Sequence, residues 1–300
     1  LNYVLGNIDD SYEYYKLLFE INPRQVLSRH PFLTLLNYHS STTQKVYLEQ
    51  CKLYSSIIEK NNNYDFVSQK IKTNKIKLGF FSSDFKKHSV SFFLKDFINS
   101  IDKNQFEITA FSNLDKTFGD EMTNELKNSF DYWYDIFSYN DSDLIDFVRK
   151  KNINILIDLN GYTLGNRLNI FAERVAPIQI LWLGYCNSTG LKNMDYLISD
   201  VNCIKTDEEN QYSEKIIYMP NTFMSGDDTQ KISKKNLKRR DFGIPNDAII
   251  YCCFNKSYKI TPGVFSIWIN VLKEVENSIL WLNISNNQTK LNIINYAKRN

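Results

Sequence analysis

The sequence predicts an α/β protein of two doubly wound domains that follow an all-helical segment. From residue 76 onward, short apolar runs alternate with stretches whose apolar residues recur at helical spacing. The apolar runs are nearly continuous, which is typical of parallel strands covered by helices on both faces. This alternation stops at a polar, basic stretch, residues 226–243, and then resumes. A second domain is therefore expected after it.

The bulk composition fits a globular protein. The chain has 300 residues, enough for about two domains, and 43% of them are hydrophobic, so disorder is not expected. The 36 basic and 34 acidic residues give a net charge of +2, which indicates neither a nucleic-acid partner nor a membrane surface.

The composition also bears on location and metal binding. No apolar run approaches the roughly 18 residues of a membrane span, and no signal peptide is visible. The five cysteines lack C-x-x-C spacing and the three histidines lack metal-ligand spacing. We expect a cytoplasmic protein with reduced thiols and no metal site.

Residues 1–70 are expected to be helical, and residues 1–23 look like the end of a tetratricopeptide repeat. Gly6 and Asn7 would form the turn between helices, and Pro23 would close the unit. One helical face carries Ser11, Tyr15 and Leu18. Such repeats stack, so others are expected upstream. The alternative is an ordinary amphipathic helix that ends at a proline. Residues 24–70 are predicted helical, with loop signals at 61–65 and 72–75.

The first α/β domain is predicted to fill residues 76–225. Its expected strands are 76–81, 106–113, 131–137, 153–161, 178–184, 194–200 and 214–220. Its expected helices are 89–101, 119–130 and 141–151.

Residues 226–243 are interpreted as a solvated linker, and residues 244–300 as the start of the second domain. The pattern predicts a buried strand at 248–253, a helix at 261–275, a strand at 278–285 and a helix at 289–299. Both ends of the chain look cut, so this second domain is expected to be incomplete. Two such domains in tandem form the GT-B architecture, but several enzyme classes share it, so it does not define a function.

Doubly wound sheets bind ligands beyond the carboxyl ends of their strands, and the loop 82–89 (SSDFKKHS) lies there. A neutral His88 at the start of a helix can orient or deprotonate a hydroxyl group. Asp84 can cap or hold the loop. The alternative is a surface histidine beside an N-cap serine.

Two further loops of the first domain carry clustered polar groups. In 158–167 (DLNGYTLGNR), polar groups gather at a strand end, namely Asp158, Asn160, Gly161, Tyr162 and Thr163; a generic strand-to-helix turn is the alternative. In 182–190 (WLGYCNSTG), Gly184 and Gly190 bracket a polar stretch that can bring backbone N–H groups near a ligand. Neither a G-x-G-x-x-G nor a P-loop motif is present, which disfavours dehydrogenases and P-loop NTPases.

The stretch 254–260 (FNKSYKI) lies where a predicted strand of the second domain meets a helix. It carries Lys256 and Lys259, which either face an anionic ligand or are surface charges.

Taken together and in this order, the quoted loops resemble the family 41 glycosyltransferases, which include the O-GlcNAc transferase catalytic region and its SPINDLY relatives. The resemblance covers about residues 76–300 and includes the stretches IKLGFFSSDFKKHS, ILIDLNGYTLGNR, WLGYCNSTG, YSEKIIYMPNTF and AIIYCCFNKSYKI. The segment HPFLTLLNY (30–38) also resembles the helical segment that leads into that catalytic region.

The resemblance implies roles for residues of the first lobe. His88 matches an active-site histidine. The second strand-end loop of the family corresponds to Asp158, Asn160, Gly161, Tyr162 and Thr163. Leu183 and Gly184 match a loop that approaches the sugar. This chain has Cys186 where the family usually has proline, and Phe92 where the animal enzyme has a second histidine.

For the second lobe, the resemblance implies that Lys259 contacts the donor diphosphate and that Asn255 and Lys256 lie beside the nucleotide. Lys256 stands where relatives often have Gln or Asn, so the details of donor binding are open.

The resemblance also implies the activity. Family members transfer a sugar to Ser/Thr hydroxyls with inversion and without a metal or other cofactor, and the nucleotide sugar is a co-substrate. UDP-GlcNAc is the first-choice donor, and GDP-fucose is the SPINDLY-like alternative. Protein or peptide acceptors would bind through upstream tetratricopeptide repeats. A repeat scaffold with a degenerate transferase lobe is the competing interpretation. The 300-residue chain alone is expected to lack activity.

Overall fold

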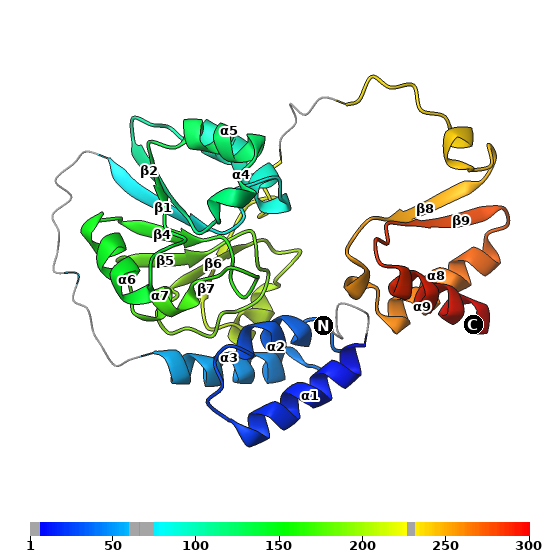
Figure 1. Ribbon diagram of the computed structural model, residues 1–300, viewed down its shortest axis with the longest axis horizontal. Helices are drawn as coiled ribbons and strands as arrows, with labels where there is room; N and C mark the ends of the chain where they lie inside the picture. Colours follow the sequence, from blue (N-terminus) through cyan, green and yellow to red (C-terminus); the bar gives the residue numbers. More distant parts are fainter. Residues whose placement is uncertain (1–6, 60–65, 67–74, 227–231) are drawn as a thin grey trace. The chain divides into compact units, whose positions relative to one another are not determined.

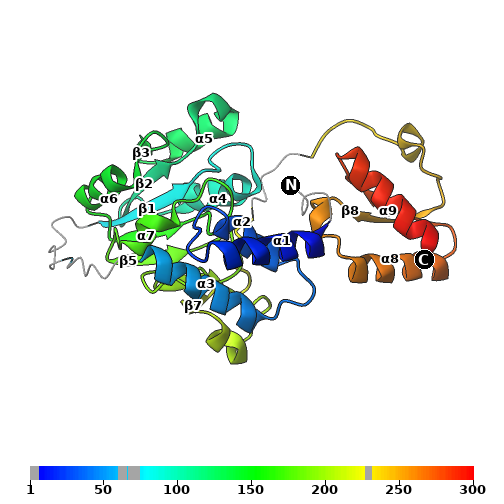
Figure 2. The same ribbon diagram turned by 60° about the horizontal axis from the view of Figure 1, so that its bottom comes forward.

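The computed structural model describes residues 7–59, 66, 75–226 and 232–300, which fall into two compact units (Figures 1 and 2). The larger unit comprises Arg24–Thr34 and Thr43–Gln230, and the smaller unit comprises Leu1–Pro23, Leu35–Thr42 and Lys231–Asn300. The predicted turn residue Gly6 and the predicted loops 61–65 and 72–74 lie outside the described residues.

The larger unit is built on one parallel sheet, as predicted. Its strands are β1 (Ile76–Ser82), β2 (Phe106–Ser112), β3 (Tyr132–Asp135), β4 (Ile155–Asp158), β5 (Ile178–Leu181), β6 (Tyr196–Ser199) and β7 (Lys215–Tyr218). They pair in the order β3-β2-β1-β4-β5-β6-β7, and every pair is parallel. The chain therefore builds outward in one direction from β1 and in the other direction from β4.

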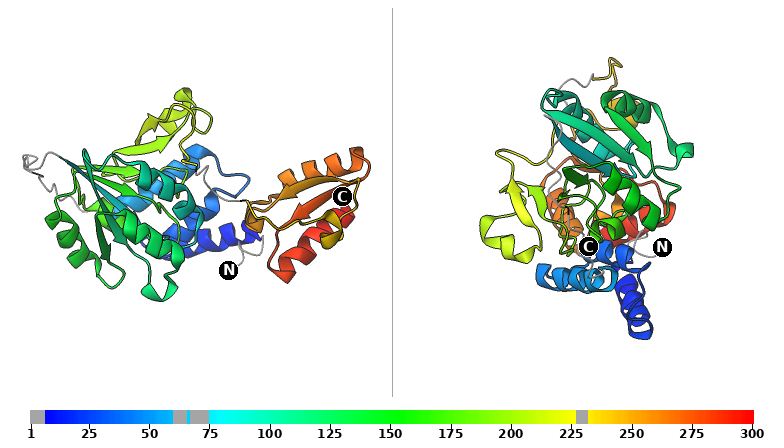
Figure 3. Two further views of the ribbon diagram at one scale, coloured as in Figure 1. Left: turned by 90° about the horizontal axis from the view of Figure 1, so that it is seen from above. Right: turned by 90° about the vertical axis from the view of Figure 1, so that its left-hand side faces the viewer.

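Helices cover both faces of this sheet (Figures 1 and 3). They are α4 (Ser89–Ser100), α5 (Glu121–Ser129), α6 (Asp141–Lys150) and the short α7 (Leu168–Ala172). Adjacent residues of β1 point to opposite faces: Phe80 packs with the α4 and α5 side chains, and Phe81 contacts Phe171 of α7. Both phenylalanines are fully buried, which explains the continuous apolar run. The prediction lacked α7 and the 3₁₀ turns η2 (Lys116–Phe118) and η3 (Thr206–Gln211).

The N-terminal region consists of α1 (Ile8–Ile21), α2 (Arg29–Leu36) and α3 (Gln44–Ile58). The prediction that residues 24–70 are helical is wrong at 24–28 and 37–43, which lie outside the helices. Thr43 starts α3 anew, because its hydroxyl accepts a hydrogen bond from the Val46 amide. No helix follows β5 directly, and α3 packs there against α7 and η3.

In α1, the predicted face is the more buried one, since Ser11 is buried and Tyr15 and Leu18 are half-buried. The tetratricopeptide assignment itself stays a prediction.

The C-terminal part of the smaller unit has the predicted order of strand, helix, strand and helix. Its elements are β8 (Ile249–Cys253), α8 (Pro262–Glu274), β9 (Ser278–Leu282) and α9 (Asn287–Arg299), with the 3₁₀ turns η4 (Arg239–Phe242) and η5 (Ser257–Lys259). The prediction that strand 248–253 is buried is wrong. Ile249, Tyr251 and Cys252 are exposed, because within the described residues β8 pairs with β9 alone. The described linker residues, 226 and 232–243, are exposed, as expected of a solvated connection.

None of the helices among the described residues is long and apolar enough to cross a membrane.

An ion pair at the amino ends of β5 and β6 provides a stability test. Asp195 accepts two hydrogen bonds from the Arg174 guanidinium, at 2.9 and 2.8 Å, and a third from the Gln179 amide at 2.9 Å. Asp195→Asn should lower the free energy of unfolding by about 1–3 kcal/mol, because charge-assisted bonds are lost. Chemical denaturation measures this. Glu125→Gln, in the more exposed pair with Lys95, should change it by less than about 1 kcal/mol. Equal losses of unfolding free energy in the two variants would contradict the conclusion that the Arg174–Asp195 pair stabilises the fold more than the Lys95–Glu125 pair.

Candidate active site

The carboxyl ends of β1 and β4 lie side by side at the point where the strand order reverses. In open α/β sheets this reversal is where ligands bind, because the two flanking loops diverge and leave a crevice. The residues at this point are Ser83 and Asp84 after β1, and Leu159 and Asn160 after β4.

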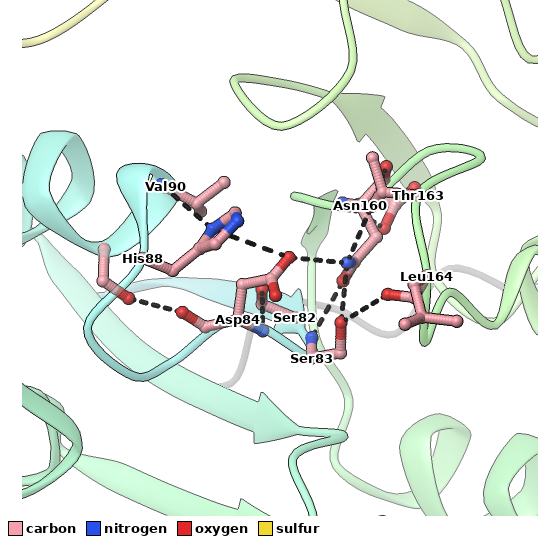
Figure 4. Close-up of polar contacts among 10 residues, drawn as sticks. Ser82, Ser83, Asp84, His88, Val90, Asn160, Thr163 and Leu164 are labelled. Carbon is pink, nitrogen blue, oxygen red and sulfur yellow. Dashed lines mark hydrogen bonds and ion pairs between the residues drawn. The ribbon is translucent and has the colours of Figure 1, made fainter. Parts of the chain in front are cut away.

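Asn160 joins these two loops through its carboxamide (Figure 4). Its side chain is fully buried. Its oxygen accepts a hydrogen bond from the Ser83 amide at 2.9 Å. Its nitrogen, which carries two N–H donors, lies within hydrogen-bond distance of three acceptors: the Ser83 hydroxyl at 2.8 Å, the Asp84 carboxylate at 3.2 Å and the Thr163 hydroxyl at 3.1 Å. Asn160 therefore serves first to hold the site together.

Asp84 lies between Asn160 and His88 (Figure 4). Its Oδ2 is 3.8 Å from Nδ1 of His88, and its backbone oxygen accepts a hydrogen bond from the Ser91 hydroxyl at 2.6 Å. Burial raises the pKa of Asp84, while the nearby His88, Lys86 and the Asn160 hydrogen bond lower it. The predicted holding role of Asp84 agrees with these contacts.

His88 lies at the surface, as the alternative interpretation had it, but His88 itself and not a serine is the N-cap of α4. Its Nδ1 lies 3.4 Å from the Val90 amide nitrogen, and this contact is a hydrogen bond only when Nδ1 carries no proton. The side chain is 45% exposed, so the imidazole has one side on Asp84 and remains accessible to a ligand.

Asp158 shapes the β4 turn from inside the protein. Its two carboxylate oxygens accept hydrogen bonds from the Asn160 and Gly161 amides, at 3.1 and 2.8 Å. Burial raises the pKa of Asp158 to about 7, and the two backbone hydrogen bonds oppose that rise. The side chain is 1% exposed, so it supports the turn and does not face solvent.

The loop after β5 (the β5 loop, residues 182–195) packs tightly against the loop after β4 (the β4 loop, residues 159–167). Leu183 has a left-handed φ of 70°, and the Gly184 amide donates to the Trp182 oxygen at 2.8 Å. A Cβ atom on residue 184 would lie 1.8 Å from the Leu159 backbone oxygen, so only glycine fits there. The two predicted loops are thus brought together.

The expectation that the β5 loop offers backbone N–H groups to a ligand is wrong for residues 188–191. The Ser188 amide donates to Asn187 Oδ1, and the Thr189 amide donates to Glu214 Oε1. The Gly190 amide donates to Ser188 Oγ, and the Leu191 amide donates to Thr189 Oγ1. They are already used inside the protein.

Tyr162 is also buried, which the loop pattern did not predict. Its hydroxyl donates to the Thr189 backbone oxygen, and its ring packs against His30, Tyr54 and Tyr185. Its role is to join the β4 and β5 loops.

The helices α2 and α3 support these loops. The sequence analysis predicted the loops but not this support from the N-terminal helices. His30 of α2 lies 2.5 Å from the Tyr54 hydroxyl of α3, and burial lowers the pKa of His30 to about 4, so the imidazole is neutral. Tyr47 of α3 donates to the Ser188 oxygen at 3.0 Å. The resemblance of HPFLTLLNY to the family's helical segment was the available signal.

The second-lobe residues lie on the turn after β8, within the smaller unit. Asn255, Lys256 and Lys259 are all exposed. Lys259 ends η5, and α8 begins three residues later with Thr261 as its N-cap. Among the described residues, no carboxylate forms an ion pair with Lys256 or Lys259, so both ammonium groups can meet an anion.

Within the described part of the chain, no group of three or more His, Cys, Asp or Glu side chains is arranged to hold a metal ion. The expectation of metal-free chemistry stays a prediction.

Comparison with known proteins gives a consistent family match. The sequence profile of glycosyl transferase family 41 matches residues 22–239 and 230–300. A probable UDP-N-acetylglucosamine–peptide N-acetylglucosaminyltransferase SEC from Arabidopsis thaliana is 32% identical over 213 residues, covering 69% of this chain and 22% of that protein. A SPINDLY protein with the same activity in its name, from Oryza sativa subsp. japonica, is 27% identical over 89% of this chain and 29% of its own length. The chain thus spans less than a third of these relatives.

A solved structure agrees with the fold. A mutant O-GlcNAc transferase of Thermobaculum terrenum superposes with a TM-score of 0.84, at 21% identity, covering 99% of this chain and 56% of that one. The α/β fold class of GT-B type is therefore confirmed.

The buried Asp158 carboxyl predicts a pH dependence. Its pKa is about 7 in the folded protein against 3.8 as the ordinary value. Its stabilising contribution is therefore complete below about pH 4 and is lost as the pH rises through about 7. In Asp158→Asn, the free energy of unfolding, measured by chemical denaturation over this range, should decline less steeply with rising pH than in the wild type. The difference in slope should be up to about 1.4 kcal/mol per pH unit. Asp207→Asn, at an exposed position, should keep the wild-type slope. An unchanged slope in Asp158→Asn would contradict the raised pKa.

Proposed function

Because the chain belongs to glycosyltransferase family 41, we propose that the protein transfers a sugar from a nucleotide sugar to serine or threonine hydroxyls of other proteins. The observation that carries this proposal is the His88–Asp84–Asn160 group at the topological switch point of the larger unit. Relatives are named as UDP-N-acetylglucosamine–peptide transferases, which supports UDP-GlcNAc as the donor. GDP-fucose is the second donor to test.

His88 acts in this proposal as the general base. The acceptor hydroxyl oxygen attacks the anomeric carbon, the bond from that carbon to the diphosphate oxygen breaks, and the hydroxyl proton passes to Nε2 of His88. A single displacement of this kind inverts the anomeric configuration. Of the two tautomers of the neutral imidazole, an ionised Asp84 favours the one that carries its proton on Nδ1, which leaves the Nε2 lone pair available. Such a base contributes about 10²–10⁴-fold in rate.

Lys259 neutralises the leaving diphosphate in this proposal. The leaving group gains negative charge as the bond breaks, and an exposed ammonium group beside the start of α8 is suited to stabilise it. No metal or other cofactor is required for that step. Asn255 and Lys256 on the same turn are proposed to lie beside the nucleotide.

The activity is proposed for the whole protein, because this chain spans 22% and 29% of two named relatives. We propose that acceptor proteins bind through upstream tetratricopeptide repeats. The 300-residue chain alone is expected to show no turnover, and turnover by it would refute that expectation.

In the whole protein, Lys259→Ala should lower kcat with UDP-GlcNAc by about 10²–10³-fold, because charge stabilisation in the transition state is lost. A radiolabelled sugar-transfer assay measures the rate, and GDP-fucose is tested in parallel. Lys298→Ala removes an exposed lysine of α9 and should leave kcat unchanged. Wild-type turnover in Lys259→Ala would remove Lys259 from the mechanism. Absence of transfer from either donor in the wild type would favour the scaffold interpretation.

A further inference from the structure

Glu214 is a buried carboxylate next to the β5 loop. It immediately precedes β7 and is 4% exposed. Its Oε2 accepts hydrogen bonds from the Ser188 hydroxyl at 2.7 Å and the Ser213 hydroxyl at 3.0 Å. Its Oε1 accepts from the Thr189 amide at 2.7 Å and the Thr189 hydroxyl at 2.5 Å. No Lys, Arg or His within the described residues forms an ion pair with it, so its oxygens are satisfied by neutral donors.

Keeping a carboxylate buried without a cation costs free energy unless its oxygens are satisfied by hydrogen bonds. Here the donors come mainly from two consecutive residues of one loop, Ser188 and Thr189. If these residues shifted, the carboxylate would lose its donors. The loop is therefore held at this position by its hydrogen bonds to the Glu214 side chain.

Thr189 connects Glu214 to the β4 loop by hydrogen bonds to both. Its amide and hydroxyl bind Glu214, and its carbonyl oxygen accepts the hydrogen bond from the Tyr162 hydroxyl. Tyr162 follows Gly161, and a Cβ atom at residue 161 would lie 2.4 Å from Cβ of Tyr185. The two loops are thus linked at Thr189 and in contact at Gly161.

Helix α3 closes the other side of the β5 loop. The Ser188 carbonyl oxygen accepts from the Tyr47 hydroxyl at 3.0 Å and from the Cys51 thiol at 3.6 Å. Gln44 and Asn187 exchange two side-chain hydrogen bonds, at 2.6 and 3.2 Å. Glu214 and α3 therefore both hold the β5 loop, Glu214 through the Ser188 hydroxyl and α3 through the Ser188 carbonyl oxygen.

We propose that Glu214 is a positioning residue for the transferase site. Through Thr189 and Tyr162, it fixes the β5 and β4 loops in the conformation that binds the nucleotide sugar. The proposal rests on the proposed function for its consequence in catalysis. It assigns Glu214 no contact with substrate.

Three variants test it. Glu214→Ala removes every acceptor atom. Glu214→Gln keeps the acceptor oxygen for the Thr189 amide, and its NH₂ group can donate to the hydroxyls of Ser188 and Ser213, which can also accept. Glu49→Ala is the matched control, an exposed glutamate on α3.

The first measurement is amide hydrogen exchange by mass spectrometry on the 300-residue chain. Glu214→Ala should exchange faster than wild type in residues 158–163 and 187–191, and equally in α5. Glu214→Gln and Glu49→Ala should match the wild type. Faster exchange confined to 187–191 would overturn the proposal, because the link through Thr189 to the β4 loop would then be absent. If Glu214→Ala does not fold, Tyr162→Phe, which breaks the same link, should raise exchange in both loops; exchange unchanged in 158–163 would overturn the proposal.

The second measurement is sugar transfer by the whole protein at a temperature where all variants are folded. Glu214→Ala should lower kcat by about 10²-fold with little change in KM, since misplaced reacting groups slow the chemical step. Glu214→Gln should restore the wild-type rate. Equal kcat in Glu214→Ala and wild type would overturn the role in catalysis. An inactive wild type would refute the proposed function instead, and the exchange measurement would still decide whether Glu214 positions both loops.

Discussion

The carboxamide of Asn160 is the interaction on which the rest of the candidate site depends. Ser83 and Asn160 are 77 residues apart in the chain, and the parallel pairing of β1 with β4 brings their loops to one edge. The amide oxygen faces an N–H group, and the amide nitrogen faces a carboxylate and two hydroxyls. The reverse orientation would place the amide oxygen against the carboxylate and the amide nitrogen against the N–H group. A buried amide without partners would cost about 1–3 kcal/mol per group, so the two loops hold each other in one arrangement.

The chemistry of the site follows from that arrangement. Asn160 holds Asp84, and Asp84 lies beside the imidazole of His88, which alone of these three side chains is substantially exposed. Asn160 is fully buried and the Asp84 side chain is only 14% exposed, whereas the reactive imidazole is accessible. Such preorganisation places charge before the reaction begins, so that little rearrangement is needed in the transition state. The β5 loop adds to it by fitting against Leu159 at Gly184.

Much of this was predictable from the sequence, because continuous apolar runs such as 76–81 have one simple interpretation in an alternating α/β chain. The seven strands of the larger unit, their parallel pairing and the positions of the site loops were all predicted. Three features were not. Thr43 restarts a helix within a region without strong breakers. β8 is apolar yet exposed, since burial depends on neighbouring strands. Glu214 looks like any surface glutamate in the sequence, because its partners in 188–189 are brought to it only by the pairing of β6 with β7 and the path of the β5 loop.

We propose that Asp84 and Asn160 prepare His88 to accept a proton. The most direct test is the tautomer of His88, measured from the ¹⁵N chemical shifts and two-bond couplings of its ring in the neutral imidazole form. We expect the proton to reside on Nδ1, facing Asp84, and Nε2 to be unprotonated. Asp84→Asn should shift the population toward Nε2–H, because the carboxylate that attracts the Nδ1 proton is gone. A wild-type His88 with its proton on Nε2, and with Nδ1 bound only to the Val90 amide, would contradict this role of Asp84.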